Sequence, residues 1–140
     1  MFLNILIFTL AILIVYMIYS FFIKISDREP RFIDSEEALV PSEIIQLEVL
    51  NGCGMEGVAD RFTDFLRNQN FDVVKTGNYI HYDVEETLVI DRIGNLANAK
   101  KTAEVLGIDS KNVLQQLNDD YFLDVSVIIG KDYFKLKPLN

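Results

Sequence analysis

The residues from Phe2 to Ile23 form an uncharged and almost wholly apolar run, and this run limits what the chain can fold into more than any other feature. As a helix it would be about 33 Å long, which is enough for the hydrocarbon core of a bilayer. It lacks the basic start, the short apolar core and the small residues of a cleaved signal peptide. We therefore predict an uncleaved transmembrane anchor over residues 1–23, with the membrane as partner through residues 2–23.

The rest of the chain has room for one domain. Residues 24–43 are charged and contain Pro30 and Pro41, so they are predicted to be an acidic flexible linker. A domain is expected over residues 44–136, followed by a short tail at 137–140. Basic residues directly after the run would alone place this domain in the cytoplasm, but acidic residues are mixed with them, so the orientation stays open here. They are Lys24, Arg28 and Arg31.

Charge and residue counts exclude several kinds of site. The formal net charge of -8 disfavours nucleic-acid binding, which needs clustered Lys and Arg. The one cysteine, Cys53, excludes an intramolecular disulfide and a thiolate metal cluster. The one histidine, His81, has no second histidine or cysteine nearby, so no metal site and no cofactor are expected.

The stretch from Ile44 to Leu66 predicts a strand, a glycine-rich turn and a helix. Apolar residues at 45, 47 and 49 alternate with polar ones, which is typical of a strand with one buried face. The apolar residues of the following segment share one helical face. They are Val58, Phe62, Phe65 and Leu66. Between strand and helix, Gly52, Gly54 and Gly57 form the pattern G-x-G-x-x-G.

This glycine pattern has two interpretations. A dinucleotide-binding turn would need an acidic residue at the end of the next strand, but Asp72 stands at its start. The chain also has no room for a six-stranded nucleotide domain. A tight turn with close packing of helix and strand is favoured. A cytoplasm-facing nucleotide or small-anion sensor is kept as the alternative function.

The later residues predict further strands at 71–76, 87–91, 113–115 and 124–129, and a second helix at 96–106. Gly77 and Asn78 are expected to break the second strand. Asn95 is a suitable N-cap and Gly107 a suitable residue after the second helix. The order β-α-β-β-α-β-β predicts a small two-layer α/β sandwich, with two helices on a mixed sheet, preceded by the transmembrane helix.

Four segments in this order resemble the LytR C-terminal domain, the domain appended to LytR-CpsA-Psr cell-wall proteins. They are Val49-Leu50-Asn51-Gly52-x-Gly54-x-x-Gly57, Phe71-Asp72-Val73-Val74, Thr87-x-Val89-Ile90 with Arg92-x-Gly94, and the close from Asp124 to Tyr133, which ends in G-x-D-[FY]. Together they cover Ile45 to Phe134. The resemblance implies a domain on the outer side of the cytoplasmic membrane, behind a single anchor, and this outweighs the basic residues after the run.

The resemblance implies no reaction, because the chain has no room for the catalytic domain of larger relatives. No nucleophile and base stand in a recognisable motif, so no enzyme is expected. We expect a binding or scaffold module that contacts cell-wall glycopolymer or an envelope protein. The sequence does not give its oligomeric state.

Two groups of residues are candidates for contact with a ligand. If the strands at 45–49 and 87–91 run parallel, their following turns meet at one sheet edge, where Arg92 and backbone N–H groups could bind a phosphate or carboxylate. The candidate ligand-binding residues are Asn51, Gly52, Gly54, Gly57, Arg92, Gly94 and Asn95. The alternative is that they only shape two turns, with Arg92 paired to Asp91 or Glu56. A possible recognition loop holds Tyr79, His81 and Tyr82, whose aromatic rings could instead cover a core edge.

Overall fold

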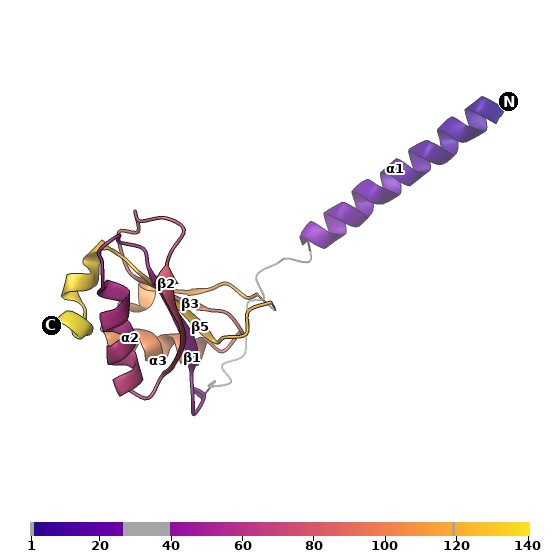
Figure 1. Ribbon diagram of the computed structural model, residues 1–140. Helices are drawn as coiled ribbons and strands as arrows, with labels where there is room; N and C mark the ends of the chain where they lie inside the picture. The colour runs from indigo at the N-terminus through magenta and orange to yellow at the C-terminus, as the bar shows by residue number, and fades with distance from the viewer. Residues whose placement is uncertain (1, 27–39, 119) are drawn as a thin grey trace. The chain divides into compact units, whose positions relative to one another are not determined.

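The structure, a computed structural model, describes residues 2–26, 40–118 and 120–140 (Figure 1). The chain divides into two compact units, residues 1–36 and residues 37–140. In the first unit, helix α1 spans Phe2–Ser26 and covers the apolar run. Among the described residues, no helix is long and apolar enough to cross a membrane, so the structure does not show the predicted span. Most of the predicted flexible linker, residues 27–39, lies outside the described residues.

The second unit contains the predicted elements in the predicted order. They are β1 (Gln46–Asn51), α2 (Val58–Asn68), β2 (Asp72–Asn78), β3 (Leu88–Asp91), α3 (Leu96–Leu106), β4 (Val113–Gln115) and β5 (Val125–Ile129). Short 3-10 segments are η1 (Ser110–Asn112), η2 (Lys131–Lys135) and η3 (Lys137–Leu139). The mixed α/β fold expected from the sequence is confirmed.

The five strands form one mixed sheet in the order β2-β1-β5-β3-β4. Strand β1 is parallel to both of its neighbours, β2 and β5, whereas β3 is antiparallel to β5. Strands β1 and β3 therefore run in opposite directions. The turn after β1 and the turn after β3 consequently lie at opposite edges of the sheet.

The main core lies between the sheet and the two helices α2 and α3, which cover the same face of the sheet (Figure 1). Inward side chains from both helices pack on alternate residues of the strands, as the period of each element requires. Examples with no exposed surface are Phe62 and Leu66 of α2, Leu106 of α3, and Leu47 and Val49 of β1. These contacts explain why the apolar positions of the sequence predicted the helices well.

The other face of the sheet is also largely covered, and this corrects the prediction that β1 buries one face only. A second apolar cluster here contains Leu50, Ile90 and Ile128, with Val84 of a crossing loop packed against it. Glu48, the polar residue of the alternating pattern, has 0% exposed surface. A single strand cannot reveal loops that fold back over it from elsewhere in the chain.

Three predicted boundaries also change. Gly77 and Asn78 do not break β2, because they pair with Leu50 and Asn51 of β1. The backbone N–H of Ser42, placed in the linker by the sequence, donates to the side chain of Asn98 over 2.7 Å. Of residues 137–140, predicted to be a tail, Lys137–Leu139 form η3, and Leu139 packs against the main core.

Candidate functional site

The turn after β1 is held together by the side chain of Asn51. Its Oδ1 accepts hydrogen bonds from the backbone N–H groups of Cys53 and Gly54, over 3.1 and 3.0 Å. Its Nδ2 donates to the carbonyl of Met55, and the N–H of Gly52 donates to the carbonyl of Ile129. These groups are therefore used inside the protein, where a phosphate would need free donors.

The structure explains each glycine of the G-x-G-x-x-G pattern, either by lack of space for a side chain or by the backbone conformation. A Cβ on Gly52 would lie 2.8 Å from a methyl of Val84 and 2.9 Å from the carbonyl of Ile129. Gly54 and Gly57 have φ values of +77° and +76°, in the left-handed region that favours glycine. The geometry supports the favoured interpretation of a tight turn with close packing.

The predicted ligand-binding residues Arg92, Gly94 and Asn95 lie at the opposite edge of the sheet from Asn51 and the glycine turn. The prediction that the two turns meet at one edge is therefore wrong. It depended on parallel β1 and β3, whereas these strands run in opposite directions. Gly94 has a φ of +91° in the turn after β3, whose N–H groups at residues 93 and 94 bond to the buried carboxylate of Asp91. Asn95 is the N-cap residue of α3, but its side chain makes no capping hydrogen bond. It donates instead to the carbonyl of Val40 over 3.4 Å.

Arg92 points onto the helix-free face of the sheet and pairs with neither Asp91 nor Glu56. Its Nε donates to Ser126 Oγ over 2.8 Å, and its Nη1 donates to Gln116 Oε1 over 2.9 Å. Its guanidinium carbon lies 4.6 Å from the ring centroid of Tyr121. The guanidinium of Arg92, which was predicted from the sequence to bind a phosphate or carboxylate, thus contacts Ser126, Gln116 and Tyr121 of the same chain.

A polar network that the sequence did not predict continues from Arg92 across the sheet. The hydroxyl of Ser126 donates to Glu48 Oε1 over 2.8 Å, and Lys75 Nζ lies 3.0 Å from Glu48 Oε2. The hydrogen bond and the charge attraction from Glu48 raise the pKa of Lys75 above its ordinary value. Because the buried carboxylate has both a hydroxyl and an ammonium partner, its burial is compensated. The network connects the three adjacent strands β2, β1 and β5 with the residues directly after β3 and β4.

The residues of the possible recognition loop lie between β2 and β3. Tyr79 is partly buried against the second apolar cluster, with its ring centroid 6.4 Å from that of His81. Tyr82 is 52% exposed, and its Cβ would lie 3.3 Å from a Cβ on Gly54. Tyr79 thus covers a core edge, whereas Tyr82 and His81 remain accessible.

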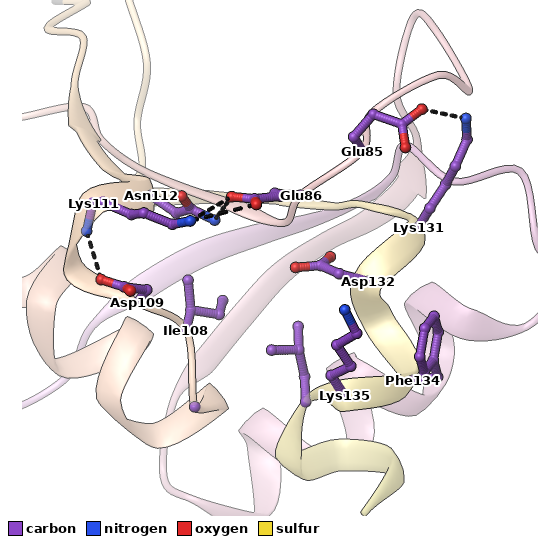
Figure 2. Close-up of a pocket in the computed structure, with 12 residues that line it drawn as sticks. Glu85, Glu86, Ile108, Asp109, Lys111, Asn112, Lys131, Asp132, Phe134 and Lys135 are labelled. Carbon is purple, nitrogen blue, oxygen red and sulfur yellow. Dashed lines mark hydrogen bonds and ion pairs between the residues drawn. The ribbon is translucent and has the colours of Figure 1, made fainter.

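An open cavity of about 560 Å³ lies at the edge of the sheet where β3 begins and β5 ends (Figure 2). It is formed by the loop before β3, the C-terminal end of α3 with η1, and η2. Charged side chains line most of it. They are Glu85, Glu86, Asp109 and Asp132, with Lys111, Lys131 and Lys135.

Two ion pairs lie on the rim of this cavity. Lys131 Nζ lies 2.6 Å from Glu85 Oε1, and Lys111 Nζ lies 3.3 Å from Glu86 Oε2. Hydrogen bonds from Asn112 and Lys111 lower the pKa of Glu86, and the contact with Glu85 raises the pKa of Lys131. All four charged partners are at least half exposed, so each pair contributes little to stability.

Three charged groups of the cavity, Asp109, Asp132 and Lys135, are not held by such pairs. Asp109 Oδ1 accepts from the backbone N–H of Lys111 over 3.1 Å. Asp132 Oδ1 accepts from the N–H and the hydroxyl of Thr87, over 2.8 and 2.7 Å, while its Oδ2 has no hydrogen bond to any described residue. Lys135 Nζ has no ion pair among the described residues and lies 5.5 Å from the ring centroid of the exposed Phe134. In Figure 2 the side chains of Asp132 and Lys135 point into the space between the loop and η2.

The sequence carried a partial signal for this cavity. Asp132 belongs to the G-x-D-[FY] ending, and the adjacent carboxylates Glu85 and Glu86 stand directly before β3. Because β3 and β5 are antiparallel, the start of one lies beside the end of the other. No local pattern of residues indicates that β3 and β5 are antiparallel, so these two segments could not be placed together from the sequence.

Comparison with known proteins identifies the family of this chain through a family model. A family model described as "LytR cell envelope-related transcriptional attenuator" matches residues 44–133. A solved structure, "Solution Structure of the C-terminal domain of RV0431", is 27% identical, covers 65% of this chain and 74% of that chain, and has a TM-score of 0.41. No curated protein matches the chain. Because the family model spans more than half of the sequence, this chain belongs to the LytR C-terminal domain family of cell-envelope-related domains.

Proposed function

We propose that this protein is a membrane-anchored, non-catalytic binding or scaffold module of the cell envelope, which contacts cell-wall glycopolymer or an envelope protein. The observation that carries the proposal is the open cavity of about 560 Å³, which has the size of a small-molecule or oligomer-unit site. Outside the rim pairs, Lys135 lies 5.5 Å from the ring centroid of the exposed Phe134, a ring that can stack on a ligand. Membership of an envelope-related family supports the location.

The anchor is proposed from the sequence. Residues 2–23 carry no charged side chain and lie within helix α1, Phe2–Ser26, which is 25 residues long. We place the following domain on the outer side of the cytoplasmic membrane, with residues 24–43 as a tether. At full extension, the part of the tether from residue 27 to residue 39 spans at most about 45 Å, which keeps the domain close to the bilayer.

Co-sedimentation with purified wall material tests the binding function. The full chain, solubilised in detergent, is expected to sediment with the wall fraction, and Lys135→Met should reduce the bound fraction. Lys101→Met is the matched control, because Lys101 is exposed on α3 and does not line the cavity. If the chain is retained neither by wall material nor by envelope protein extracts, the proposed function is wrong.

A further inference from the structure

We propose that the cavity between the loop before β3 and η2 takes a zwitterionic ligand, one that carries both an ammonium and a carboxylate. This inference rests on the proposed binding function and names the ligand chemistry of the same site. The inference goes beyond the proposed function because it excludes a class of ligand: a polymer of uniform negative charge would not fit this cavity.

The charged side chains that line the cavity are of both signs. Four carboxylates and three ammonium groups surround the space, and the chain as a whole has a formal net charge of -8. A polyanionic ligand would approach an acidic protein and would meet carboxylates on the loop, on η1 and on η2. Like charges brought together in this way oppose association. A ligand with both signs avoids this repulsion.

The rim pairs leave Lys135 as the available ammonium, with Asp109 and Asp132 as the available carboxylates. Glu85 and Glu86 are engaged by Lys131 and Lys111, so a ligand would have to compete with these contacts. Asp132 keeps one carboxylate oxygen without a hydrogen bond to any described residue, because Thr87 binds only the other oxygen. Lys135 has no ion pair in the described part of the chain. A ligand ammonium can therefore bind Asp132 while a ligand carboxylate binds Lys135.

The position of Asp132 is fixed by the fold. Thr87 contributes both its N–H and its hydroxyl to the same carboxylate oxygen, and the hydroxyl oxygen of Thr87 accepts from the N–H of Gly130 over 3.0 Å. A Cβ on Gly130 would lie 2.5 Å from the carbonyl carbon of Glu86, so the two segments touch closely here. This close contact restricts the segment that carries Asp132, so less conformational entropy is lost there when a ligand binds.

Tri-alanine with four combinations of end groups is the probe. The free-ended peptide carries both charges, the N-acetylated form only the carboxylate, the amidated form only the ammonium, and the doubly blocked form neither. Amide chemical shifts of the full chain in detergent micelles report binding. Each blocked end should weaken binding by about two- to fivefold, the range for a partly exposed ion pair.

Two variants assign each charge to its residue. Lys135→Met should remove the preference for the free carboxylate and keep the preference for the free ammonium. Asp132→Asn should do the reverse, and the new side-chain oxygen can still accept from Thr87, so the fold is retained. Lys101→Met should change neither preference.

The outcomes separate this inference from the proposed function. Equal affinity for the four peptides, no binding of the free-ended peptide, or an order of affinity that both variants leave unchanged overturns the inference, even if the chain sediments with wall material. Charge-selective binding that responds to the two variants supports it. That result together with no retention by wall or envelope extracts would overturn only the envelope role.

Discussion

Glu48 lies in the middle of the helix-free face of the sheet, with no exposed surface, and depends on two neighbours of different kinds. The hydroxyl of Ser126, also fully buried, donates a hydrogen bond to the Glu48 carboxylate. Lys75, whose side chain is 62% exposed, forms an ion pair with the same carboxylate. An ionised group that has left water needs such partners. Removing Lys75 leaves the buried carboxylate of Glu48 without its cationic partner. The expected loss of stability is therefore larger than the loss of an exposed ion pair would cause.

A double-mutant cycle tests this dependence. Lys75→Met should lower the free energy of unfolding by about 1–2 kcal/mol in the natural chain, between the values for exposed and buried pairs. In a Glu48→Gln background the same change should cost about 0.5 kcal/mol or less, because no buried charge is left unpaired. Urea denaturation of the full chain in detergent measures both. An equal cost of Lys75→Met in the two backgrounds would contradict the proposed dependence.

The same pair predicts a loss of stability at alkaline pH. The hydrogen bond and charge of Glu48 raise the pKa of Lys75 in the folded protein above the value in the unfolded chain. Its contribution is therefore complete below the ordinary lysine pKa of about 10.4 and is lost as pH rises through the folded value. The difference in urea midpoint between the natural chain and Lys75→Met should shrink from about pH 10 upward. A difference that stays constant to pH 12 would show that this ammonium contributes nothing that titrates.

At the scale of elements, the turn between β1 and α2 allows the reasons for two glycines to be separated. Gly57→Ala should cost about 1–2 kcal/mol, from the left-handed backbone alone, because no atom lies within 4 Å of the added Cβ. Gly57→Asn should cost less, since Asn tolerates this region. Gly52→Ala and Gly52→Asn should both cost about 1–3 kcal/mol, because Val84 and the carbonyl of Ile129 leave no room.

Urea midpoints of the four variants check this prediction. If Asn restores stability at Gly52 as well as at Gly57, the close contact with Val84 does not limit that position. Nucleotides should produce no shift in the thermal midpoint of the natural chain, because Asn51 and Ile129 already accept the N–H groups of this turn. A clear shift would favour the nucleotide sensor.

Local patterns were sufficient to predict the elements but not their directions. Buried Phe62 and Leu66 recur at helical spacing, and Gly107, with φ +79°, ends α3 where the sequence placed its cap. The direction of β3 depends on its pairing with β5, which stands more than 30 residues later, and no local pattern specifies that pairing. The two predicted turns therefore fell at opposite edges, while the cavity beside Asp132 arose where no site was expected.

The burial of Glu48 illustrates the same limit for single residues. The alternation of polar and apolar residues correctly identified Leu47 and Val49 as core residues, both with 0% exposed surface. On the opposite face, Tyr79 and Val84 of the loop between β2 and β3 pack against Leu50, Ile90 and Ile128, and no pattern within β1 indicates this cover. A polar residue in an alternating pattern is exposed only if nothing else folds over its face.

At the scale of the whole molecule, the side of the membrane on which the domain lies decides which ligands it can meet. The family is related to the cell envelope, whereas Lys24, Arg28 and Arg31 after the apolar run favour a cytoplasmic position. The family relation outweighs these three basic residues, so we expect the domain outside the cytoplasmic membrane. A wall peptide or an envelope protein could then reach the cavity directly.

Thiol labelling in intact cells tests this position. Cys53→Ser removes the natural thiol, and Ser35→Cys places a new one between helix α1 and the domain. A membrane-impermeant thiol reagent should label the double variant in intact cells to the same extent as after lysis. Cys53→Ser alone is the control and should stay unlabelled in both conditions. Labelling that appears only after lysis would place the domain in the cytoplasm, where wall polymers are absent, and would make nucleotides and cytoplasmic proteins the ligands to test against the cavity.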